Sequence, residues 1–290
     1  MRPQLPCMEP APPRPPSSAP AADRNGPDAI RLVLLHFLGG SAREWQEVTR
    51  CLGEGVRPLA LDLPGFGAAA AEPGYAVADM ADRLAGIIAA QLPSCPSGCP
   101  PGCPPGRWVL VGHSMGAKLA AVLARRALDG EAGLEGLAGL VLLAGSPPSP
   151  EPMAEARREE MLGWFQGPPE ERRAQAERFI DNNVVTLPPE SRRLAIEDVL
   201  RANPAAWRHW LESGSREDWG RRVGILPYPT LILAGGEDAD LGPAAQRRLM
   251  APHFPESRLE VLSGLRHLLP LEGPERVAAL MRDFLAECAR

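Results

Sequence analysis

The stretch RWVLVGHSMGAK, Arg107 to Lys118, decides the fold of this chain. It opens as a short apolar run typical of a strand and continues, from near Met115, as a helix. Between the two, Ser114 stands in the pattern G-x-S-x-G, with a glycine two residues to either side. A strand that turns tightly into a helix leaves room only for small residues and lifts the central side chain above the sheet edge. We therefore predict that Ser114 is a nucleophile near the positive end of that helix.

Strands and helices alternate along the rest of the chain. The runs IRLVLLHF and PLALDLP are typical of strands, and SAREWQEVTRCL between them has helical spacing with Ser41 as its N-cap. The alternation continues with a helix over about Ala76 to Leu92, the strands RWVLVG, LAGLVLLAG, YPTLILAGG and SRLEVLSG, a helix from Pro243 to about Met250 and a last helix from near Pro274. Because most of these strands are apolar along their length, we predict an α/β fold with a mostly parallel, doubly wound sheet covered on both faces.

The alternation breaks between Pro147 and Arg222, where the sequence is rich in charge and helix formers and holds four of the six tryptophans. We predict that residues 147–222 form a helical insertion in an α/β core made of residues 29–146 and 223–290. Two further segments are expected to stand outside this core. Residues 1–28 are rich in proline, which predicts a disordered arm, and the Pro/Gly/Cys-rich residues 93–106 predict a loop insertion.

Composition narrows the function classes. The chain has 290 residues, is 44% hydrophobic and carries a formal net charge of -5. Its charges are scattered, without the basic stripe that nucleic acids require, so we expect no nucleic-acid partner. No apolar run approaches the length that crosses a bilayer. The N-terminus has no apolar segment typical of a secretory signal. The six cysteines of the whole chain then favour a reducing compartment, so we expect a cytoplasmic protein with mostly free thiols.

A serine nucleophile needs a histidine that acts as its base. His267 follows the last predicted strand, so its side chain comes to the carboxyl edge of the sheet, where Ser114 is expected. We therefore predict that His267 is the base. The other four histidines are expected to be structural or peripheral: His36 and His113 beside motif glycines, His209 in the insertion and His253 near the end of a helix.

The histidine in turn needs an acid that orients it, from the carboxyl end of the preceding strand. That end has the sequence LILAGGEDADLGP and offers Glu237, Asp238 and Asp240. Asp238 fits best by position, and Asp240 is the alternative.

Donors for the developing oxyanion complete the predicted site. One is the backbone N–H of Met115, directly after the nucleophile. The other is expected from the loop HFLGGS after the first strand, where we favour the N–H of Leu38 over that of Phe37 by position.

Taken together and in this order, these motifs resemble those of the α/β-hydrolase superfamily. The resemblance covers about Ile30 to Leu285 and rests on HFLGGS, DLPGFG, GHSMG and the pair GGEDAD with RHLLPLE. It implies the Ser-Asp-His triad matched above and a helical cap at residues 147–222, with Asp62 as a turn former rather than a catalyst. Phe37 stands where the family usually has glycine, which narrows the loop of the second oxyanion donor.

Cys95, Cys99 and Cys103, ahead of the nucleophile strand, raise the alternative of a metal or redox site. Their C-x3-C-x3-C spacing differs from the paired cysteines of zinc sites, and no fourth ligand stands nearby. Proline and glycine also prevent the helix that would place the thiols on one face. We expect a low-complexity loop, with no metal and no cofactor.

The predicted function is that of a serine hydrolase that cleaves a small ester, thioester or related carbonyl substrate through an acyl-enzyme. Two alternatives stay open: a lyase of the same fold, similar to the C–C bond lyase of the menaquinone pathway, and a non-catalytic binding protein. Lys118 would bind an acidic substrate in the lyase, or it is a solvated helix residue. Phe37 is a candidate pocket wall, and the cap offers Trp164, Phe165, Trp207 and Trp210 as further walls, although packing inside the cap would also explain these four. Substrate identity and oligomeric state stay open.

Overall fold

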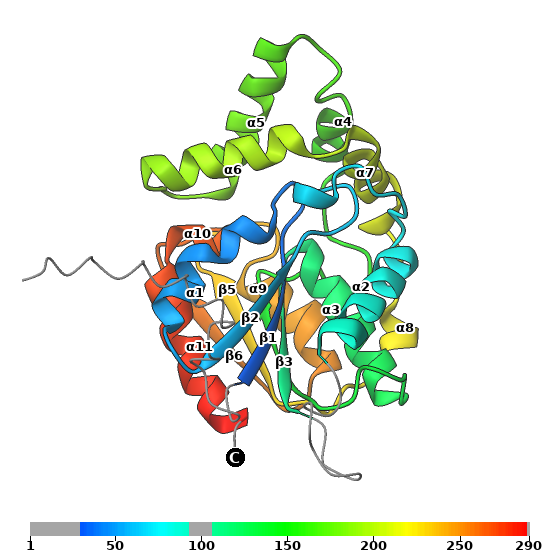
Figure 1. Cartoon of the computed structure of the whole chain (residues 1–290). Coiled ribbons are helices and arrows are strands. Elements are labelled where there is room, and N and C mark those ends of the chain that lie inside the picture. The colour runs from blue at the N-terminus through cyan, green and yellow to red at the C-terminus, as the bar shows by residue number, and fades with distance from the viewer. Residues whose placement is uncertain (1–29, 93–105, 289–290) are drawn as a thin grey trace, which may run out of the picture.

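The structure, a computed structural model, describes residues 30–92 and 106–288 (Figure 1). The predicted arm over residues 1–28 lies outside the described residues. So does nearly all of the predicted loop insertion over residues 93–106, with Cys95, Cys99 and Cys103. What the sequence predicts for these two segments therefore stays a prediction.

A six-stranded sheet forms the centre of the molecule, and its neighbouring strands run parallel in the order β2-β1-β3-β4-β5-β6. The strands are β1 (Ile30–Leu35), β2 (Val56–Leu61), β3 (Trp108–His113), β4 (Leu137–Leu143), β5 (Thr230–Gly235) and β6 (Ser257–Leu262). The predicted parallel α/β sheet is thus confirmed. Because β3 lies between β1 and β4, the turn that follows it comes to the middle of the sheet's edge.

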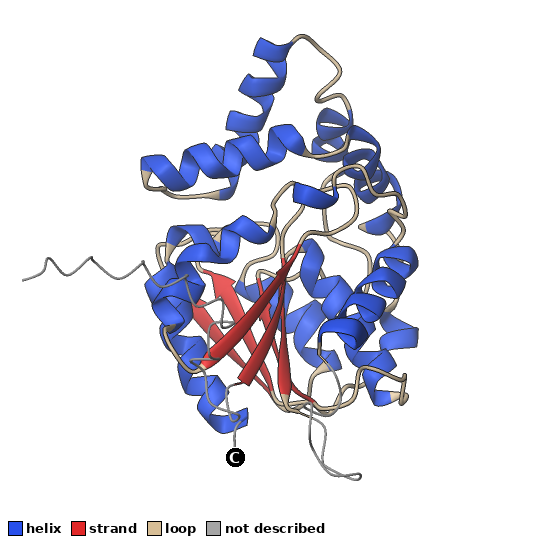
Figure 2. Cartoon of the chain, in the orientation of Figure 1, coloured by secondary structure: helices blue, strands red, loops and turns tan. Residues whose placement is uncertain are grey.

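Helices cover both faces of this sheet (Figure 2). The core helices are α1 (Gln46–Leu52), α2 (Val77–Gln91), α3 (Met115–Leu128), α9 (Pro243–Ala245), α10 (Leu269–Glu272) and α11 (Pro274–Cys288). α1 packs with α11 on one face, and α2 packs with α3 on the other. A π-helical turn over Gln246–Met250 continues α9, so the helix predicted from Pro243 has a wider second half.

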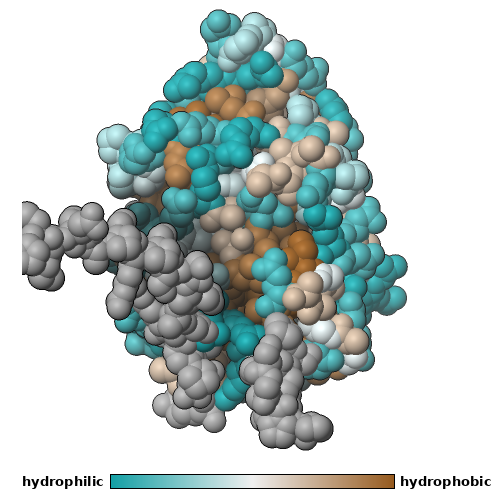
Figure 3. All heavy atoms as spheres, viewed as in Figure 1, coloured by the Kyte–Doolittle hydropathy of each residue, from teal (hydrophilic) through white to brown (hydrophobic). Residues whose placement is uncertain are grey.

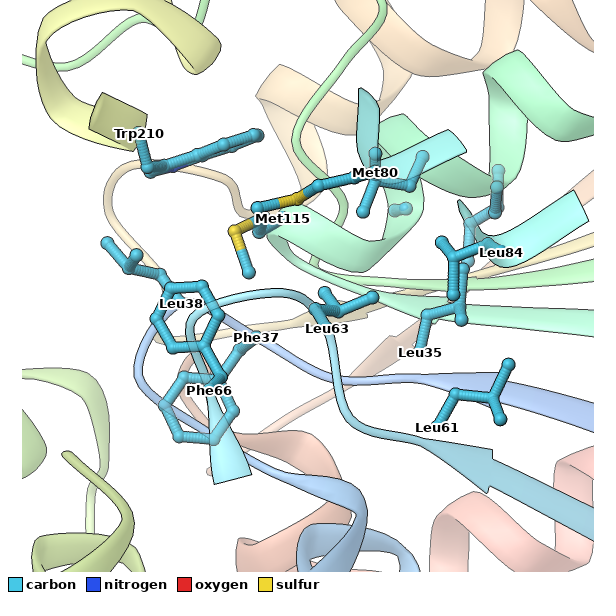
Figure 4. Packing of buried hydrophobic residues seen from close by; sticks show 14 of the residues in the cluster. Leu35, Phe37, Leu38, Leu61, Leu63, Phe66, Met80, Leu84, Met115 and Trp210 are labelled. Carbon is cyan, nitrogen blue, oxygen red and sulfur yellow. The ribbon is translucent and has the colours of Figure 1, made fainter. Parts of the chain in front are cut away.

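The side chains of each inner strand alternate between two apolar cores. In β1, Leu32 and Leu34 pack with residues of α1 and α11, whereas Val33 and Leu35 pack with residues of α2 and α3. All four are fully buried. Burial of each such side chain is worth about 1.5–3 kcal/mol, which is why an uninterrupted apolar run specifies a strand covered on both faces. The second core extends from the sheet to Trp210 of the insertion (Figure 4).

The insertion between β4 and β5 is helical and lies as a cap above one edge of the sheet (Figure 1). Its helices are α4 (Glu155–Leu162), α5 (Pro169–Asn183), α6 (Pro189–Arg201), α7 (Pro204–His209) and α8 (Gly220–Val223), with a π-helical turn over Trp210–Gly214 after α7. α8 returns to the core and packs on α3. The outer surface of the cap is mostly hydrophilic (upper part of Figure 3), as expected of helices with one apolar face.

Polar contacts tie the cap to the loops of the core. Asp198 of α6 is buried. Its carboxylate accepts hydrogen bonds from Ser41 Oγ at 2.7 Å and from Arg43 Nε at 3.0 Å. Just before α7, Asn203 donates its backbone N–H to the carbonyl of Gly65 at 2.8 Å. The cap is therefore fastened on the side of the loops that follow β1 and β2.

Candidate active site

Ser114 lies on a strained turn between β3 and α3. Its backbone φ of 52° is in the left-handed region, which non-glycine residues adopt rarely and which is common at functional sites. A Cβ on Gly112 would lie 2.5 Å from the carbonyl oxygen of Gly116, and a Cβ on Gly116 would lie 2.5 Å from that of Leu35. Because such contacts do not occur, the packing of the strand against the helix imposes the G-x-S-x-G spacing.

Three side chains that follow different strands meet at this turn. Ser114 Oγ lies 2.8 Å from His267 Nε2, and His267 Nδ1 lies 2.8 Å from Asp238 Oδ2. Ser114 follows β3, Asp238 follows β5 and His267 follows β6. The structure therefore brings the three predicted residues into one hydrogen-bonded line, with the hydroxyl within reach of a base and the base within reach of an acid.

The structure also separates the two candidate acids. Asp238 Oδ1 accepts the backbone N–H groups of Asp240 and Leu241, each at 3.0 Å, while Oδ2 faces His267. Burial raises the pKa of Asp238, but His267 and these two N–H donors outweigh burial, so the pKa lies below its ordinary value. By contrast, 57% of the side chain of Asp240 is exposed. Asp238 is thus the ionised carboxylate that contacts His267.

His267 is held through both its side chain and its backbone. Burial lowers the pKa of His267, but Asp238 beside the ring outweighs burial, so the pKa lies above the ordinary 6.5. Its backbone N–H donates to the carbonyl of Asn183, at the end of α5, at 3.0 Å. Its backbone carbonyl accepts from His113 Nε2 at 2.9 Å. The cap and the core thus both fix the imidazole opposite Ser114.

The predicted oxyanion donors lie beside the nucleophile. Met115 is the first residue of α3, where backbone N–H groups have no acceptor within the helix. Leu38 lines the pocket over Ser114, in the loop that follows β1. The carbonyl of Phe37 accepts the N–H of Gly40 at 3.0 Å, so a tight turn folds this loop. The oxyanion role of Met115 and Leu38 stays a prediction.

A pocket opens over Ser114, between the sheet edge and the cap. Its apolar walls come from both parts of the chain: Phe37, Leu38 and Leu241 from the core, and Met153, Met161, Phe179 and Trp210 from the cap. Of the residues predicted as pocket walls, Phe37 and Trp210 lie in this set. Apolar walls around a few polar groups are typical of sites for small molecules.

Trp164 and Trp207, which the sequence also offered as pocket walls, do not line this pocket. Their rings stack with centroids 6.3 Å apart, and Trp207 is 2% exposed. Phe179 packs edge-on against both indoles. The wall assignment is therefore corrected: packing within the cap accounts for both tryptophans, and Trp210 is the tryptophan that reaches the pocket.

Lys118 requires a second correction, since it is neither in the pocket nor solvated. Its side chain is fully buried, and Nζ donates to the backbone carbonyls of Gly214 at 3.1 Å and Glu217 at 3.0 Å. It also lies over the ring of Trp210. Burial lowers the pKa of Lys118 to about 8. The position of Lys118 contradicts a substrate contact in the pocket, because its ammonium ties α3 to the end of the cap.

Two charged residues of the pocket, Glu151 and Arg157, escaped the sequence prediction. Glu151 accepts a hydrogen bond from Ser146 Oγ. Burial raises the pKa of Glu151, and this hydrogen bond offsets the effect only in part. Arg157 lies 3.9 Å from Asp240. Both belong to the charge-rich insertion, where charges are so frequent that the sequence singles out neither, and only the fold brings them over Ser114.

His36 and Asp62, which also belong to the sequence motifs, hydrogen-bond to the backbone of nearby loops. His36 Nε2 accepts the backbone N–H of Leu63 at 3.0 Å. Asp62 accepts the backbone N–H groups of Ala42 and Ala68, each at 2.7 Å, as a turn former does. Neither side chain lines the pocket over Ser114.

Within residues 30–92 and 106–288, no group of three or more histidine, cysteine, aspartate or glutamate side chains could hold a metal ion. In the same described residues, no helix is long and apolar enough to cross a membrane. Of the cysteines placed there, Cys51 and Cys288 are free thiols.

Known proteins that are similar to this chain include hydrolases and esterases. The model of a family described as the alpha/beta hydrolase family matches residues 32–280. Pimeloyl-[acyl-carrier protein] methyl ester esterase of Neisseria meningitidis is 26% identical over 263 residues, 89% of this chain and 95% of that protein. A solved thermophilic esterase from Thermogutta terrifontis has a TM-score of 0.72 and 26% identity, covering 90% of this chain and 91% of that one.

A shorter match is to a synthase. 2-Succinyl-6-hydroxy-2,4-cyclohexadiene-1-carboxylate synthase of Salmonella schwarzengrund is 33% identical over 132 residues, which is 46% of this chain and 45% of that protein. The similarity to the esterases thus extends over nearly the whole of both chains, whereas this one covers less than half of each.

Proposed function

We propose that this chain, which belongs to the alpha/beta hydrolase family and is similar to esterases over most of their length, hydrolyses small esters through an acyl-enzyme formed on Ser114. The observation that carries the proposal is the hydrogen-bonded line from Ser114 through His267 to Asp238 beneath the pocket. A serine hydroxyl alone is a weak nucleophile, and this arrangement gives it a base with a fixed orientation.

The reaction proceeds in two halves around the acyl-enzyme. Ser114 Oγ attacks the ester carbonyl while its proton passes to His267 Nε2, and the N–H groups of Met115 and Leu38 stabilise the oxyanion of the tetrahedral intermediate. His267 then gives the proton to the departing alcohol. In the second half, His267 takes a proton from water as the water attacks the acyl carbon, and then gives that proton to Ser114 Oγ as the bond between Oγ and the acyl carbon breaks and the acid leaves. Asp238 keeps the imidazole in the required tautomer and stabilises its cation.

Labelling with a fluorophosphonate probe tests the nucleophile directly. Wild type should be labelled covalently, and Ser114→Ala should lose both the label and turnover of nitrophenyl esters, by about 10⁶-fold if the triad acts as a unit. Ser191→Ala, in the half-buried part of α6, is the matched control and should keep both. A folded wild type that takes no label would overturn the proposal.

The ester class is supported by the relatives that match over most of their length, which are esterases. The lyase alternative drew on Lys118 as a contact for an acidic substrate, and Lys118 faces the backbone of the cap instead. The apolar walls of the pocket favour an apolar acyl group. Hydrolysis rates over a series of acyl chain lengths would define that group. The cytoplasmic location stays a prediction from the sequence.

A further inference from the structure

A buried acid and a buried histidine, neither of which takes part in the chemistry above, stand behind the catalytic histidine. Glu44 belongs to a 3-10 turn over Ala42–Trp45 and is 1% exposed, and His113 is fully buried at the end of β3. His113 Nδ1 lies 3.2 Å from Glu44 Oε1, and His113 Nε2 lies 2.9 Å from the backbone carbonyl of His267. The two side chains therefore connect the 3-10 turn to the backbone of the proposed base.

The direction of each hydrogen bond follows from the acceptor at one end. A carbonyl oxygen can only accept, so the Nε2 of His113 carries the hydrogen. Burial, with the nearby His267, lowers the pKa of His113 to about 3, so its ring is neutral and Nδ1 presents a lone pair. A carboxylate oxygen opposite that lone pair would place two acceptors in contact. Glu44 Oε1 must therefore carry a proton and donate it to Nδ1.

The surroundings of Glu44 favour this neutral acid. Burial raises the pKa of Glu44 well above its ordinary value, which outweighs the opposing influence of His36 and of the backbone N–H of Phe37. Asp198, the other acid near it, raises the pKa further, and His267 lowers it. No cation pairs with the carboxyl within the described part of the chain, as a buried carboxylate would require.

We propose that Glu44, as a neutral carboxylic acid, acts with His113 as a positioning pair that fixes the backbone of His267 opposite Ser114. The inference rests on the proposed function of His267 as the base. His113 holds the carbonyl of His267 from the core, while Asn183 holds its N–H from the cap. Glu44 sets the tautomer of His113 and so decides whether that first hydrogen bond exists. Neither Glu44 nor His113 lines the pocket over Ser114.

Two substitutions of Glu44 test whether its side chain donates a hydrogen bond to His113. In Glu44→Gln the amide N–H can donate to His113 Nδ1, so kcat should stay close to wild type. In Glu44→Leu the donor is lost, His267 shifts, and kcat should fall by about 100-fold with KM little changed, since small displacements of a catalytic group have effects of that size. Glu47→Gln, on the exposed surface of α1, is the control and should behave as wild type.

Nitrogen-15 NMR of the histidine rings gives a readout that does not depend on turnover. In wild type and Glu44→Gln, His113 should be the neutral tautomer protonated on Nε2 throughout the neutral pH range. A doubly protonated His113, or one protonated on Nδ1 alone, would overturn the proposal, as would a Glu44→Gln variant as impaired as Glu44→Leu. If Ser114 failed to take the fluorophosphonate label, the proposed function would fall, whereas the tautomer of His113 would still be measured.

Discussion

The core and the cap of this protein are built on opposite principles. In the core, strands such as β3 and β4 are largely buried, and most of their side chains pack into the two apolar cores on either face of the sheet. In the cap, the helices carry arginine–carboxylate pairs on their outer surfaces, among them Arg192 with Asp181 and Arg178 with Glu160. Exposed pairs of this kind contribute little to stability, so the cap relies on its apolar inner face and on its ties to the core.

The core and the cap contribute different parts of the site. The core supplies the reacting line of Ser114, His267 and Asp238, each placed by the end of a strand. The cap supplies walls such as Met161 and Phe179. Changes in the core should therefore alter the rate of the chemical step, and changes in the cap should alter which ester is accepted. The predictions below test where this division holds.

The largest effect is expected in the core, at Asp238. Asp238→Asn keeps the shape of the side chain but favours the wrong tautomer of His267, and it should lower kcat by about 10⁴-fold. Asp240→Asn is the matched control two residues away, and because Asp240 is exposed it should stay near wild type. Steady-state kinetics on one nitrophenyl ester would decide between them, and equal losses in both variants would contradict the assignment of Asp238.

The next effect concerns the tie between core and cap at Lys118. Lys118→Met leaves the carbonyls of Gly214 and Glu217 without their donor and should lower the free energy of unfolding by about 3 kcal/mol, the cost of buried polar groups without partners. Arg193→Met, which removes two exposed pairs on α6, should cost almost nothing. Urea unfolding measures both, and an unchanged Lys118→Met would show that the cap is held without this contact.

Lys118 should also make the free energy of unfolding depend on pH. The folded protein lowers the pKa of Lys118 to about 8 from the ordinary 10.5, so between these two pH values the unfolded chain binds more protons. Stability of wild type relative to Lys118→Met should therefore rise across that range. Urea titrations of both proteins at several pH values would show the rise, and parallel pH profiles would argue against a buried, charged Lys118.

A smaller effect is expected on substrate choice from the cap. Met161→Ala enlarges the pocket, and the ratio of kcat/KM for a longer ester to that for a shorter one should increase by about 10-fold, the effect of a methylene in an apolar pocket. Leu162→Ala, the next residue in α4, does not line the pocket and is the control. A fall in kcat for every ester alike would instead place Met161 with the reacting groups.

The smallest effect is on the pH profile. The charge of Glu151 raises the pKa of His267, so Glu151→Gln should lower that pKa. Because His267 acts as a base only when neutral, the acidic limb of the kcat/KM profile should move to lower pH, by less than about one unit. Glu155→Gln, at an exposed position paired with Arg216, should leave the limb in place. A shift to higher pH in Glu151→Gln would contradict the direction of this coupling.

Features fixed by local pattern or by strand order could be predicted from the sequence. The turn at Ser114 is local, because Gly112 and Gly116 meet the backbone around it. His267 and Asp238 could be found because parallel strands end at the same edge of the sheet. The strand order in the structure confirms the predicted fold. The catalytic roles of Ser114, Asp238 and His267 stay proposals.

Contacts between distant segments could not be predicted. Lys118 lies 96 residues from Gly214, and Glu44 lies 69 residues from His113. The hydrophobic periodicity of a sequence does not indicate which distant residues pair. A sequence also does not distinguish a buried lysine from a solvated one. Trp207 shows the same limit, since an indole packed in the cap and an indole lining a pocket have the same apolar signature.

The end of α5 has a consequence for the exchange of parts between relatives. Asn183 accepts hydrogen bonds from the backbone N–H groups of His267 at 3.0 Å and Leu268 at 3.2 Å, so the cap holds the loop of the proposed base. A chimera that transplants a foreign cap replaces this acceptor together with the pocket walls. Swaps designed to change only substrate range would then also disturb turnover. Grafts that keep the native residues around Asn183, and recombine only α4 and α6, should avoid that penalty.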